Sequence, residues 1–211
     1  MCEFLISVAI PVYNEEEQIF SNINEIHKIL NQNNINHEFI LVDDGSGDET
    51  WEEIQRLSLF LPKVKALRLS RNFGKEAALC AALDTVKGDA CIIMDADLQH
   101  PPGIIPEMVR LWHEKNYDVV EGVKTSRGKE NTPNRLGALL FYSILKKVSG
   151  FDLNGASDFK LMDRRVIDSW GQLKESNTFF RGMSAWLGYK RISVPFGVAN
   201  REVGKSKWSL V

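Results

Sequence analysis

Apolar and polar positions along residues 5–123 follow a regular pattern of short apolar runs and amphipathic stretches. Strands are predicted at the apolar runs Leu5–Pro11, Phe39–Val42, Val64–Leu69, Ala90–Met94 and Val119–Val123. Between them, apolar residues recur every three or four positions and predict helices at Glu16–Asn31, Trp51–Leu61, Gly74–Val86 and Gly103–Asn116. Thr50 and Glu53 are placed to cap the second helix. This alternation is typical of an α/β fold with a parallel sheet and right-handed crossovers.

The pattern changes after Val123. Residues Lys124–Pro133 are polar and predict a mobile loop, and Asn134–Val148 predicts a helix. Further on, we expect a turn into a short strand at Asn154–Leu161, helices at Arg164–Leu173 and Phe179–Leu187, and a last strand at Lys190–Val194. A single domain spanning residues 1–211 accommodates all of these elements.

Composition and charge restrict the class of protein. With 44% hydrophobic residues in 211, the chain can bury the core of one ordinary domain. A net charge of −2 does not favour a nucleic-acid partner. The cysteines, Cys2, Cys80 and Cys91, lack metal-ligand spacing and are expected to be buried thiols in a reducing compartment. The N-terminus has no signal-peptide pattern, and the chain stops at Val211 without a cap or polar tail, so we expect a cytoplasmic piece of a longer protein.

Candidate chemistry is concentrated where the strand Ala90–Met94 ends. Asp95 and Asp97 follow it directly, and Gln99 comes two residues later. Open α/β sheets bind their ligands at the carboxyl ends of their strands. Two carboxylates beside a phosphate are a usual way to hold Mg²⁺ or Mn²⁺. The alternative is that Asp97 only caps a turn before Pro101.

Two more polar clusters follow earlier strands. Pro11–Glu15 ends the first strand, and Asp43–Ser46 ends the second. Each cluster could be an ordinary turn, because Asp, Asn, Gly and Ser are common turn residues. Three such clusters at one edge of a sheet favour a binding site. The glycine pattern of dinucleotide-binding folds and the Walker lysine motif are both missing, which argues against those two classes.

Together these clusters resemble the family 2 glycosyltransferases of GT-A fold, and most closely the polyprenyl-phosphate glycosyltransferase branch. The segments that carry the resemblance are Val8–Glu15, Val42–Ser46, Arg71–Lys75, Asp95–Gln99, Ser157–Phe159 and Arg201–Trp208. They cover nearly the whole chain in the family's order. The resemblance implies a GT-A (Rossmann-like), mostly parallel central sheet flanked by helices.

The resemblance also implies roles for individual residues. Four would hold the nucleoside of the donor: Pro11, Tyr13, Glu15 and Asp43, with Asp43 near the base. Three would lie at a Mg²⁺ or Mn²⁺ ion: Asp95, Asp97 and Gln99, with Asp95 also by the ribose. Arg201 and Ser206 would close on the donor diphosphate from a C-terminal flap.

The chemistry of such a transfer explains why cations are needed. A nucleotide-sugar releases a nucleoside diphosphate, and a divalent ion stabilises the negative charge that grows on it. A lipid phosphate acceptor is largely dianionic at pH 7 and needs no general base. Arg127, Arg135 and, less strongly, Lys124 are suited to hold it, although each could be an ordinary surface cation.

Asp158 is a further candidate carboxylate, and its expected role depends on the acceptor. Glycosyltransferases that act on hydroxyl acceptors need a base at about this place. With a phosphate acceptor, Asp158 would instead orient the sugar or pair with Arg201. The candidate catalytic residues are therefore Asp97, Asp158, Arg127 and Arg135.

An apolar stretch at Leu136–Leu145 is a candidate for membrane contact. It is too short to span a bilayer but long enough for an interfacial helix. Arg127 and Arg135 precede it, and Lys146 and Lys147 follow, which favours an anionic surface. The alternative is a plain core helix. Residues 124–148 are thus expected to form an acceptor loop and membrane-interface helix, with membrane helices following beyond the present C-terminus.

The predicted function is metal-dependent, inverting sugar transfer to a polyprenyl phosphate at the cytoplasmic face of a membrane. UDP-glucose is the favoured donor, with GDP-mannose as the alternative. A hydroxyl acceptor on a glycan or protein, or a non-catalytic nucleotide-sugar sensor, remains as an alternative. A nucleotidyltransferase is disfavoured because its glycine-rich, basic N-terminal loop is missing. The sequence does not determine whether the chain forms a homo-oligomer.

Overall fold

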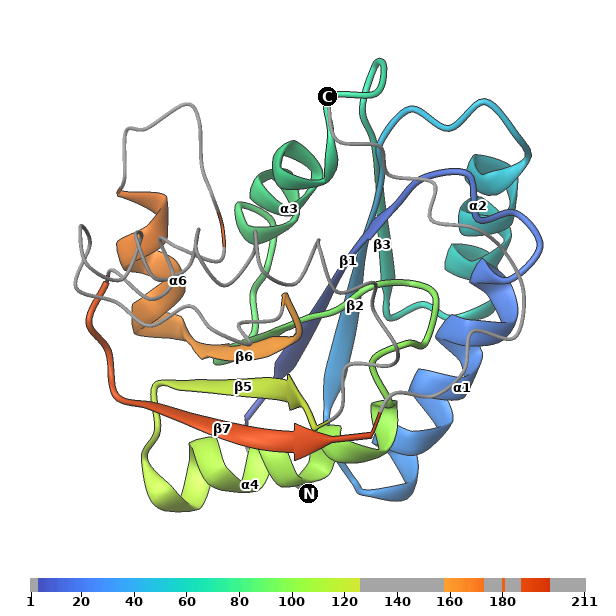
Figure 1. The fold of residues 1–211 in the computed structure, drawn as a ribbon. Helices are drawn as coiled ribbons and strands as arrows, with labels where there is room; N and C mark the ends of the chain where they lie inside the picture. Colours follow the sequence, from blue (N-terminus) through green and yellow to red (C-terminus); the bar gives the residue numbers. More distant parts are fainter. Residues whose placement is uncertain (1–3, 126–157, 173–179, 181–186, 198–211) are drawn as a thin grey trace, which may run out of the picture.

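A computed structural model describes residues 4–125, 158–172, 180 and 187–197. Its centre is a seven-stranded sheet of order β3-β2-β1-β4-β6-β5-β7 (Figure 1). The strands are β1 Ile6–Val12, β2 His37–Asp43, β3 Val64–Arg68, β4 Ala90–Ile93, β5 Val119–Lys124, β6 Lys160–Asp163 and β7 Arg191–Phe196. The helices are α1 Ile19–Gln32, α2 Thr50–Phe60, α3 Lys75–Leu83, the 3-10 turn Pro102–Ile104, α4 Ile105–Lys115 and α6 Arg164–Gly171. The predicted α/β class, with a mostly parallel sheet, is confirmed.

One strand runs against the others. β6 pairs antiparallel with both β4 and β5, whereas β1, β2, β3 and β4 pair in parallel, as do β5 and β7. The start of β6 therefore lies at the edge of the sheet where the other strands end. Asp158, which lies just before β6, is brought to that edge by this reversal.

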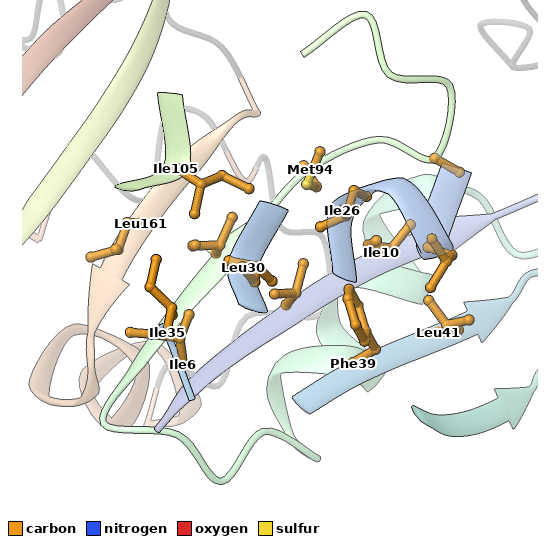
Figure 2. Packing of buried hydrophobic residues seen from close by; sticks show 14 of the residues in the cluster. Ile6, Ile10, Ile26, Leu30, Ile35, Phe39, Leu41, Met94, Ile105 and Leu161 are labelled. Atoms are coloured by element: carbon orange, nitrogen blue, oxygen red, sulfur yellow. The ribbon is translucent and has the colours of Figure 1, made fainter. Parts of the chain in front are cut away.

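Helices lie on both sides of the sheet (Figure 1). Two clusters of buried apolar side chains fill the space between the helices and the sheet. Helices α1, α2 and α4 cover one face, where Ile10 and Phe39 of the strands pack against Ile26 and Leu30 of α1 (Figure 2). Helices α3 and α6 cover the other face, against residues such as Ala9. Burying one such isoleucine or leucine stabilises the fold by about 1.5–3 kcal/mol. The predicted helical spacing in α1 and the apolar runs of the strands arise from this arrangement.

All four of the first predicted helix starts differ from the structure: α3 begins at Lys75 and not at Gly74, and α4 begins at Ile105 and not at Gly103. The starts of α1 and α2 are set by loops of the carboxyl edge. Helix α1 begins at Ile19 and not at Glu16, because Glu15 O accepts the N–H groups of Gln18 and Ile19 in a separate turn. Thr50 is the first residue of α2 and not its cap. Its hydroxyl oxygen accepts the N–H of Glu15 at 2.7 Å, so it joins two loops instead.

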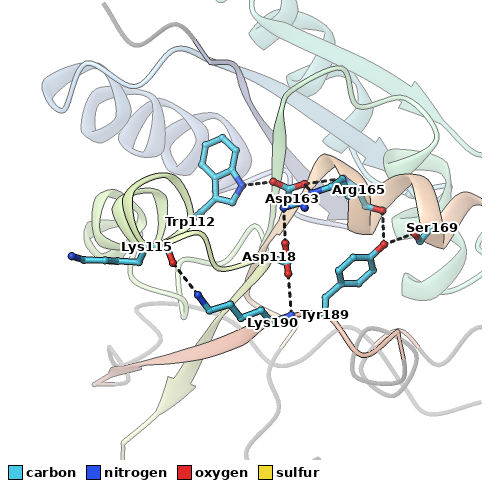
Figure 3. A network of polar contacts seen from close by, with 8 residues as sticks. All are labelled: Trp112, Lys115, Asp118, Asp163, Arg165, Ser169, Tyr189 and Lys190. Carbon is cyan, nitrogen blue, oxygen red and sulfur yellow. Dashed lines mark hydrogen bonds and ion pairs between the residues drawn. The ribbon is translucent and has the colours of Figure 1, made fainter.

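The opposite edge of the sheet is held by polar contacts between distant segments (Figure 3). Asp118, before β5, accepts from the Arg165 guanidinium at 2.7 Å and from the backbone N–H of Lys190 at 3.0 Å. Trp112 of α4 donates its indole N–H to Asp163, at the end of β6, at 2.7 Å. These contacts fix the reversed strand β6 between its neighbours, at the edge away from the candidate site.

Several predictions fall outside the described residues. They concern Arg127, Arg135, Arg201 and Ser206, the stretch Leu136–Leu145, the helix Asn134–Val148 and most of the helix Phe179–Leu187. Within the described segments, every helix is too short or too polar to traverse a bilayer.

Acid is expected to destabilise this fold through His37. This residue is 1% exposed, donates from Nδ1 to Ile35 O at 2.8 Å and accepts from His27 Nδ1 at 2.9 Å, so its ring is held neutral. Burial, with smaller contributions from Lys63 and His27, lowers the pKa of His37 from 6.5 to about 4. The unfolded chain therefore binds more protons between these pH values, and stability is lost as the pH falls from 6.5 towards 4.

The expected loss from this residue is roughly 2–3 kcal/mol in the free energy of unfolding. Urea unfolding of the wild type and of His37→Gln, each at about pH 7.5 and about pH 4.5, measures it. The difference between the two proteins should shrink at the lower pH. A difference that is the same at both pH values would show that His37 is not the responsible group.

Candidate active site

The three polar clusters meet at the carboxyl edge of the sheet, as the sequence predicted. Neighbouring strands β2, β1 and β4 end there, and reversed β6 begins there. Asp43 closes β2, the loop from Tyr13 to Glu15 follows β1, and Asp95 follows β4. Pro11 is buried within β1 opposite Val42 of β2, beyond the point where the pairing with β4 stops.

The loops after β1 and β2 are bonded into one unit. Asn14, at a positive φ of 53°, donates its backbone N–H to Ser46 Oγ at 2.9 Å. Its side-chain oxygen accepts the N–H of Gly47 at 2.9 Å. Tyr13 and Glu15 are half-buried in this unit. The sequence order Tyr-Asn-Glu after one strand and Asp-Asp-Gly-Ser after the next thus builds a single platform.

Asp43 is fully buried beneath this platform. Its Oδ1 accepts the backbone N–H of Ser46 at 3.0 Å, and its Oδ2 lies 3.1 Å from Arg68 Nε as an ion pair. The Arg68 contact does not have hydrogen-bond geometry, and Oδ2 is the one buried side-chain oxygen or nitrogen in the described residues without a hydrogen bond. Asp43 Oδ2 therefore keeps an unused hydrogen-bond acceptor position beside its ion pair with Arg68.

Asp44 has a structural role that sequence reasoning did not assign. Its two carboxylate oxygens accept the N–H groups of Phe73 and Gly74 at 2.8 and 2.9 Å. Burial raises the pKa of Asp44, and these two hydrogen bonds oppose that rise. The carboxylate thus fixes the segment Arg71–Gly74 against the end of β2. This explains the place of Arg71–Lys75 among the segments that carry the family resemblance.

The loop that carries Asp95 and Asp97 is held from several sides. Asn22 of α1 donates its side-chain N–H to Ala96 O at 2.8 Å, and Leu98 takes a positive φ of 55°. Asp97 Oδ1 accepts the N–H of Gln99 at 3.2 Å. Asp97 therefore does stabilise a turn, as the alternative interpretation expected, but this turn also keeps it next to Asp95 at the carboxyl edge.

Lys75 is the second residue at this edge to which sequence reasoning gave no role. Its Nζ lies 2.5 Å from Asp95 Oδ1 and 2.9 Å from Asp158 Oδ2. Burial lowers the pKa of Lys75, but the two carboxylates outweigh burial and raise it overall. Lys75 is therefore a fixed positive charge between the two strand ends. The only signal in the sequence was its position in the segment Arg71–Lys75.

The oxygen donors of Asp95, Asp97 and Gln99 suit a hard divalent cation such as Mg²⁺ or Mn²⁺. The described part of the chain has no group of three or more His, Cys, Asp or Glu side chains placed to hold a metal ion. Two carboxylates and an amide are fewer ligands than a closed metal cage needs. This donor set fits an ion that takes its remaining ligands from the phosphates of a substrate and from water.

Comparison with known proteins supports the resemblance. Residues 7–171 match the profile of Glycosyl transferase family 2. The chain is 38% identical over 205 residues to the uncharacterized glycosyltransferase YkcC of Bacillus subtilis, covering 97% of this chain and 63% of that protein. It is 35% identical over 205 residues to the bactoprenol glucosyl transferase of Shigella phage SfV, covering 97% and 66%. The chain thus spans slightly less than two thirds of the length of these relatives.

Solved structures share the fold at lower identity. The mannosyltransferase PcManGT of Pyrobaculum calidifontis, solved with GDP-Man and Mn²⁺, gives a TM-score of 0.65 at 20% identity, covering 91% of this chain and 55% of that one. Glucosyl-3-phosphoglycerate synthase of Mycobacterium tuberculosis, solved with Mn²⁺ and UDP-glucose, gives 0.64 at 21% identity, covering 97% and 74%. The sequence match and the shared architecture lead to one conclusion: the chain belongs to glycosyl transferase family 2 and has the GT-A fold.

Proposed function

We propose that this chain is the catalytic domain of a metal-dependent, inverting glycosyltransferase that moves a sugar from a nucleoside-diphosphate sugar to a polyprenyl phosphate at the cytoplasmic face of a membrane. The observation that carries the proposal is the arrangement at the carboxyl edge. Asp43 lies there with an oxygen that accepts no hydrogen bond, and Asp95 and Asp158 lie on either side of Lys75. The resemblance to family 2 glycosyltransferases implies that the donor binds at this edge.

The donor is proposed to bind along the ends of β2, β1 and β4. Asp43 Oδ2 would accept an N–H of the base, and the platform of Pro11, Tyr13 and Glu15 would hold the nucleoside. UDP-glucose is the favoured donor because the curated relatives include bactoprenol glucosyl transferases. GDP-mannose is the alternative.

Asp95, Asp97 and Gln99 are proposed to hold Mg²⁺ or Mn²⁺ against the donor diphosphate. When bound, the ion would supply a Lewis acid for the negative charge of the leaving diphosphate. The chain's own residues would orient the donor and exclude water around it. Arg201 and Ser206 are proposed to add contacts to the diphosphate, and Arg127 and Arg135 to hold the acceptor phosphate.

The position of Asp158 favours a phosphate acceptor over a hydroxyl acceptor. A hydroxyl group must lose its proton during attack, and a general base is needed to take it. The side chain of Asp158 is instead 9% exposed and ion-paired with Lys75 at 2.9 Å. Its Oδ2 is therefore already occupied by the Lys75 ammonium and is not open to a hydroxyl proton. A phosphate acceptor needs no such base, so Asp158 would act by orienting the sugar.

The proposal is tested with the full-length protein in detergent, radiolabelled UDP-glucose, a polyprenyl phosphate and Mn²⁺. We expect label in the lipid, and we expect Asp158→Asn to retain transfer within about tenfold of the wild type, because loss of a true general base would lower the rate by about 10²–10⁴-fold. Asp168→Asn, which removes an exposed carboxylate on α6, is the matched control.

The other outcomes identify the alternatives. Transfer to glycan or protein hydroxyl groups that is abolished in Asp158→Asn would establish a hydroxyl acceptor. Donor binding without release of nucleotide for any acceptor would establish a sensor. GDP-mannose in a parallel assay distinguishes the two donors.

A further inference from the structure

Lys75 lies at the proposed diphosphate site, but its ammonium group pairs with two carboxylates of the protein itself. It is the first residue of α3 and follows Gly74, which takes a φ of 99°. Its side chain is 21% exposed and reaches the carboxylates of Asp95 and Asp158. A hydrogen bond to Asp44 fixes the start of α3, since Asp44 accepts the N–H of Gly74 at 2.9 Å. The backbone from which the Lys75 side chain extends is therefore fixed, and the two carboxylates hold its ammonium group.

Beyond Lys75 and Asp158, further side chains of alternating charge follow across β6, β5 and β7. Lys160 of β6 is fully buried and pairs with Glu121 of β5 at 3.3 Å. Burial lowers the pKa of Lys160, and the negative charges of Glu121 and Asp158 oppose this shift. Glu121 in turn pairs with Arg191 of β7 at 3.1 Å. Asp158 therefore lies in the field of two lysines, Lys75 and Lys160. Removing Lys75 leaves Asp158 with a neighbouring cation and leaves Asp95 without this ion pair.

We propose that Lys75 is the resident counter-ion of Asp95, and that a divalent ion must displace it from Asp95 in order to bind. This rests on the proposed function, in which Asp95 and Asp97 hold the metal. Before the donor arrives, the Lys75 ammonium already neutralises the carboxylate and repels a free cation. The donor diphosphate adds the negative charge that lets the ion bind. Metal binding is thereby coupled to donor binding, and Lys75 stays paired with Asp158.

The direction of the effect follows from Coulomb's law. A positive charge a few ångströms from a carboxylate weakens that carboxylate's attraction for any second cation. The side chains of Asp95 and Lys75 are 32% and 21% exposed, so solvent reduces the effect without removing it. Exchanging Lys75 for a neutral side chain of similar length should therefore strengthen the binding of a free divalent ion.

The test measures the binding of Mn²⁺ alone, by the loss of the free Mn²⁺ signal in electron paramagnetic resonance. We expect Lys75→Met to bind Mn²⁺ about tenfold more tightly than the wild type, since it removes a full charge next to Asp95. Lys75→Arg keeps the charge and should stay within about twofold of the wild type. Lys65→Met is the matched control, because Lys65 also pairs with a carboxylate, Glu38, at 2.5 Å but on another part of the sheet.

With UDP-glucose present, the difference between Lys75→Met and the wild type should narrow, because the diphosphate then supplies the missing negative charge. Unchanged Mn²⁺ affinity in a folded Lys75→Met protein overturns the proposal. So does a double variant, Lys75→Met with Asp95→Asn, that still binds Mn²⁺ more tightly than Asp95→Asn alone. If Lys75→Met does not fold, Lys75→Met combined with Asp158→Asn removes one charge of each sign and serves instead. Failure of the proposed function has a different signature: Mn²⁺ binding with UDP-glucose that is unaffected by Asp95→Asn or Asp97→Asn in the wild-type background.

Discussion

Asp97→Asn is expected to lower the rate of sugar transfer by about 10³-fold, while the protein stays folded. Asp97 lies in the turn after β4, next to Asp95, and is proposed to hold the ion that neutralises the leaving diphosphate. An amide keeps the size of the side chain and its oxygen, so it still accepts the N–H of Gln99 that fixes the turn. It loses the negative charge that a divalent cation requires.

The measurement is transfer of label from UDP-glucose at the lowest Mn²⁺ concentration that saturates the wild type, with thermal unfolding to verify the fold. Asp168→Asn is the control for loss of one carboxylate, since Asp168 lies exposed on α6. If Asp97→Asn transfers sugar at more than about a tenth of the wild-type rate, Asp97 does not hold the ion, because loss of a key electrostatic group costs far more than that. Partial recovery at high Mn²⁺ would support it, because excess ion offsets weakened binding.

Gly45→Ala is expected to destabilise the fold by about 3–4 kcal/mol, because two separate costs add. Gly45 has a φ of 67°, a region that L-residues with a Cβ rarely adopt. A Cβ atom there would also lie 2.5 Å from the backbone carbonyl carbon of Arg71. Backbone atoms cannot rotate aside as a side chain can, so the Arg71 segment or the Asp43–Ser46 turn has to move.

Urea unfolding measures this loss, and Gly47→Ala in the same loop is the control. A Cβ atom added at Gly47 would have no other atom within 4 Å, and the φ of Gly47 is not positive. Its exchange should therefore change stability by less than about 0.5 kcal/mol. Equal stability for the two variants would contradict the close approach of these loops. Because the displaced turn contains Asp43, Gly45→Ala should also weaken donor binding in whatever fraction stays folded.

The centre of the sheet could be predicted from the sequence because strands β1, β2 and β4 are buried at every position. Runs such as Phe39–Val42 and Ala90–Met94 are apolar at every position, and the helices between them show a clear helical period. The reversal of β6 could not be predicted. A strand's direction depends on which neighbours it pairs with, and Lys160–Asp163 pairs with strands that lie far away in the chain.

The carboxylates at the strand ends of the candidate site could be predicted from the sequence, but the contacts that hold them could not. Asp43, Asp95 and Asp97 follow buried strands, so their common edge follows from the topology of any parallel sheet. Asp44 and Lys75 were missed because their roles depend on contacts across the fold. Asp44 bonds to residues 29 and 30 positions further along the chain, and Lys75 pairs with a carboxylate 83 positions further on.

The reversed strand β6 has a consequence for how the candidate site is assembled from the chain. β5 ends and β6 begins at the same edge, so the chain between Thr125 and Asp158 leaves the sheet and returns to it on the side of the candidate site. The segment includes Arg127 and Arg135, proposed to hold the acceptor. In the proposed function, the contacts to the acceptor phosphate therefore come from one segment between β5 and β6, whereas the contacts to the base and the metal ion come from the ends of β1, β2 and β4.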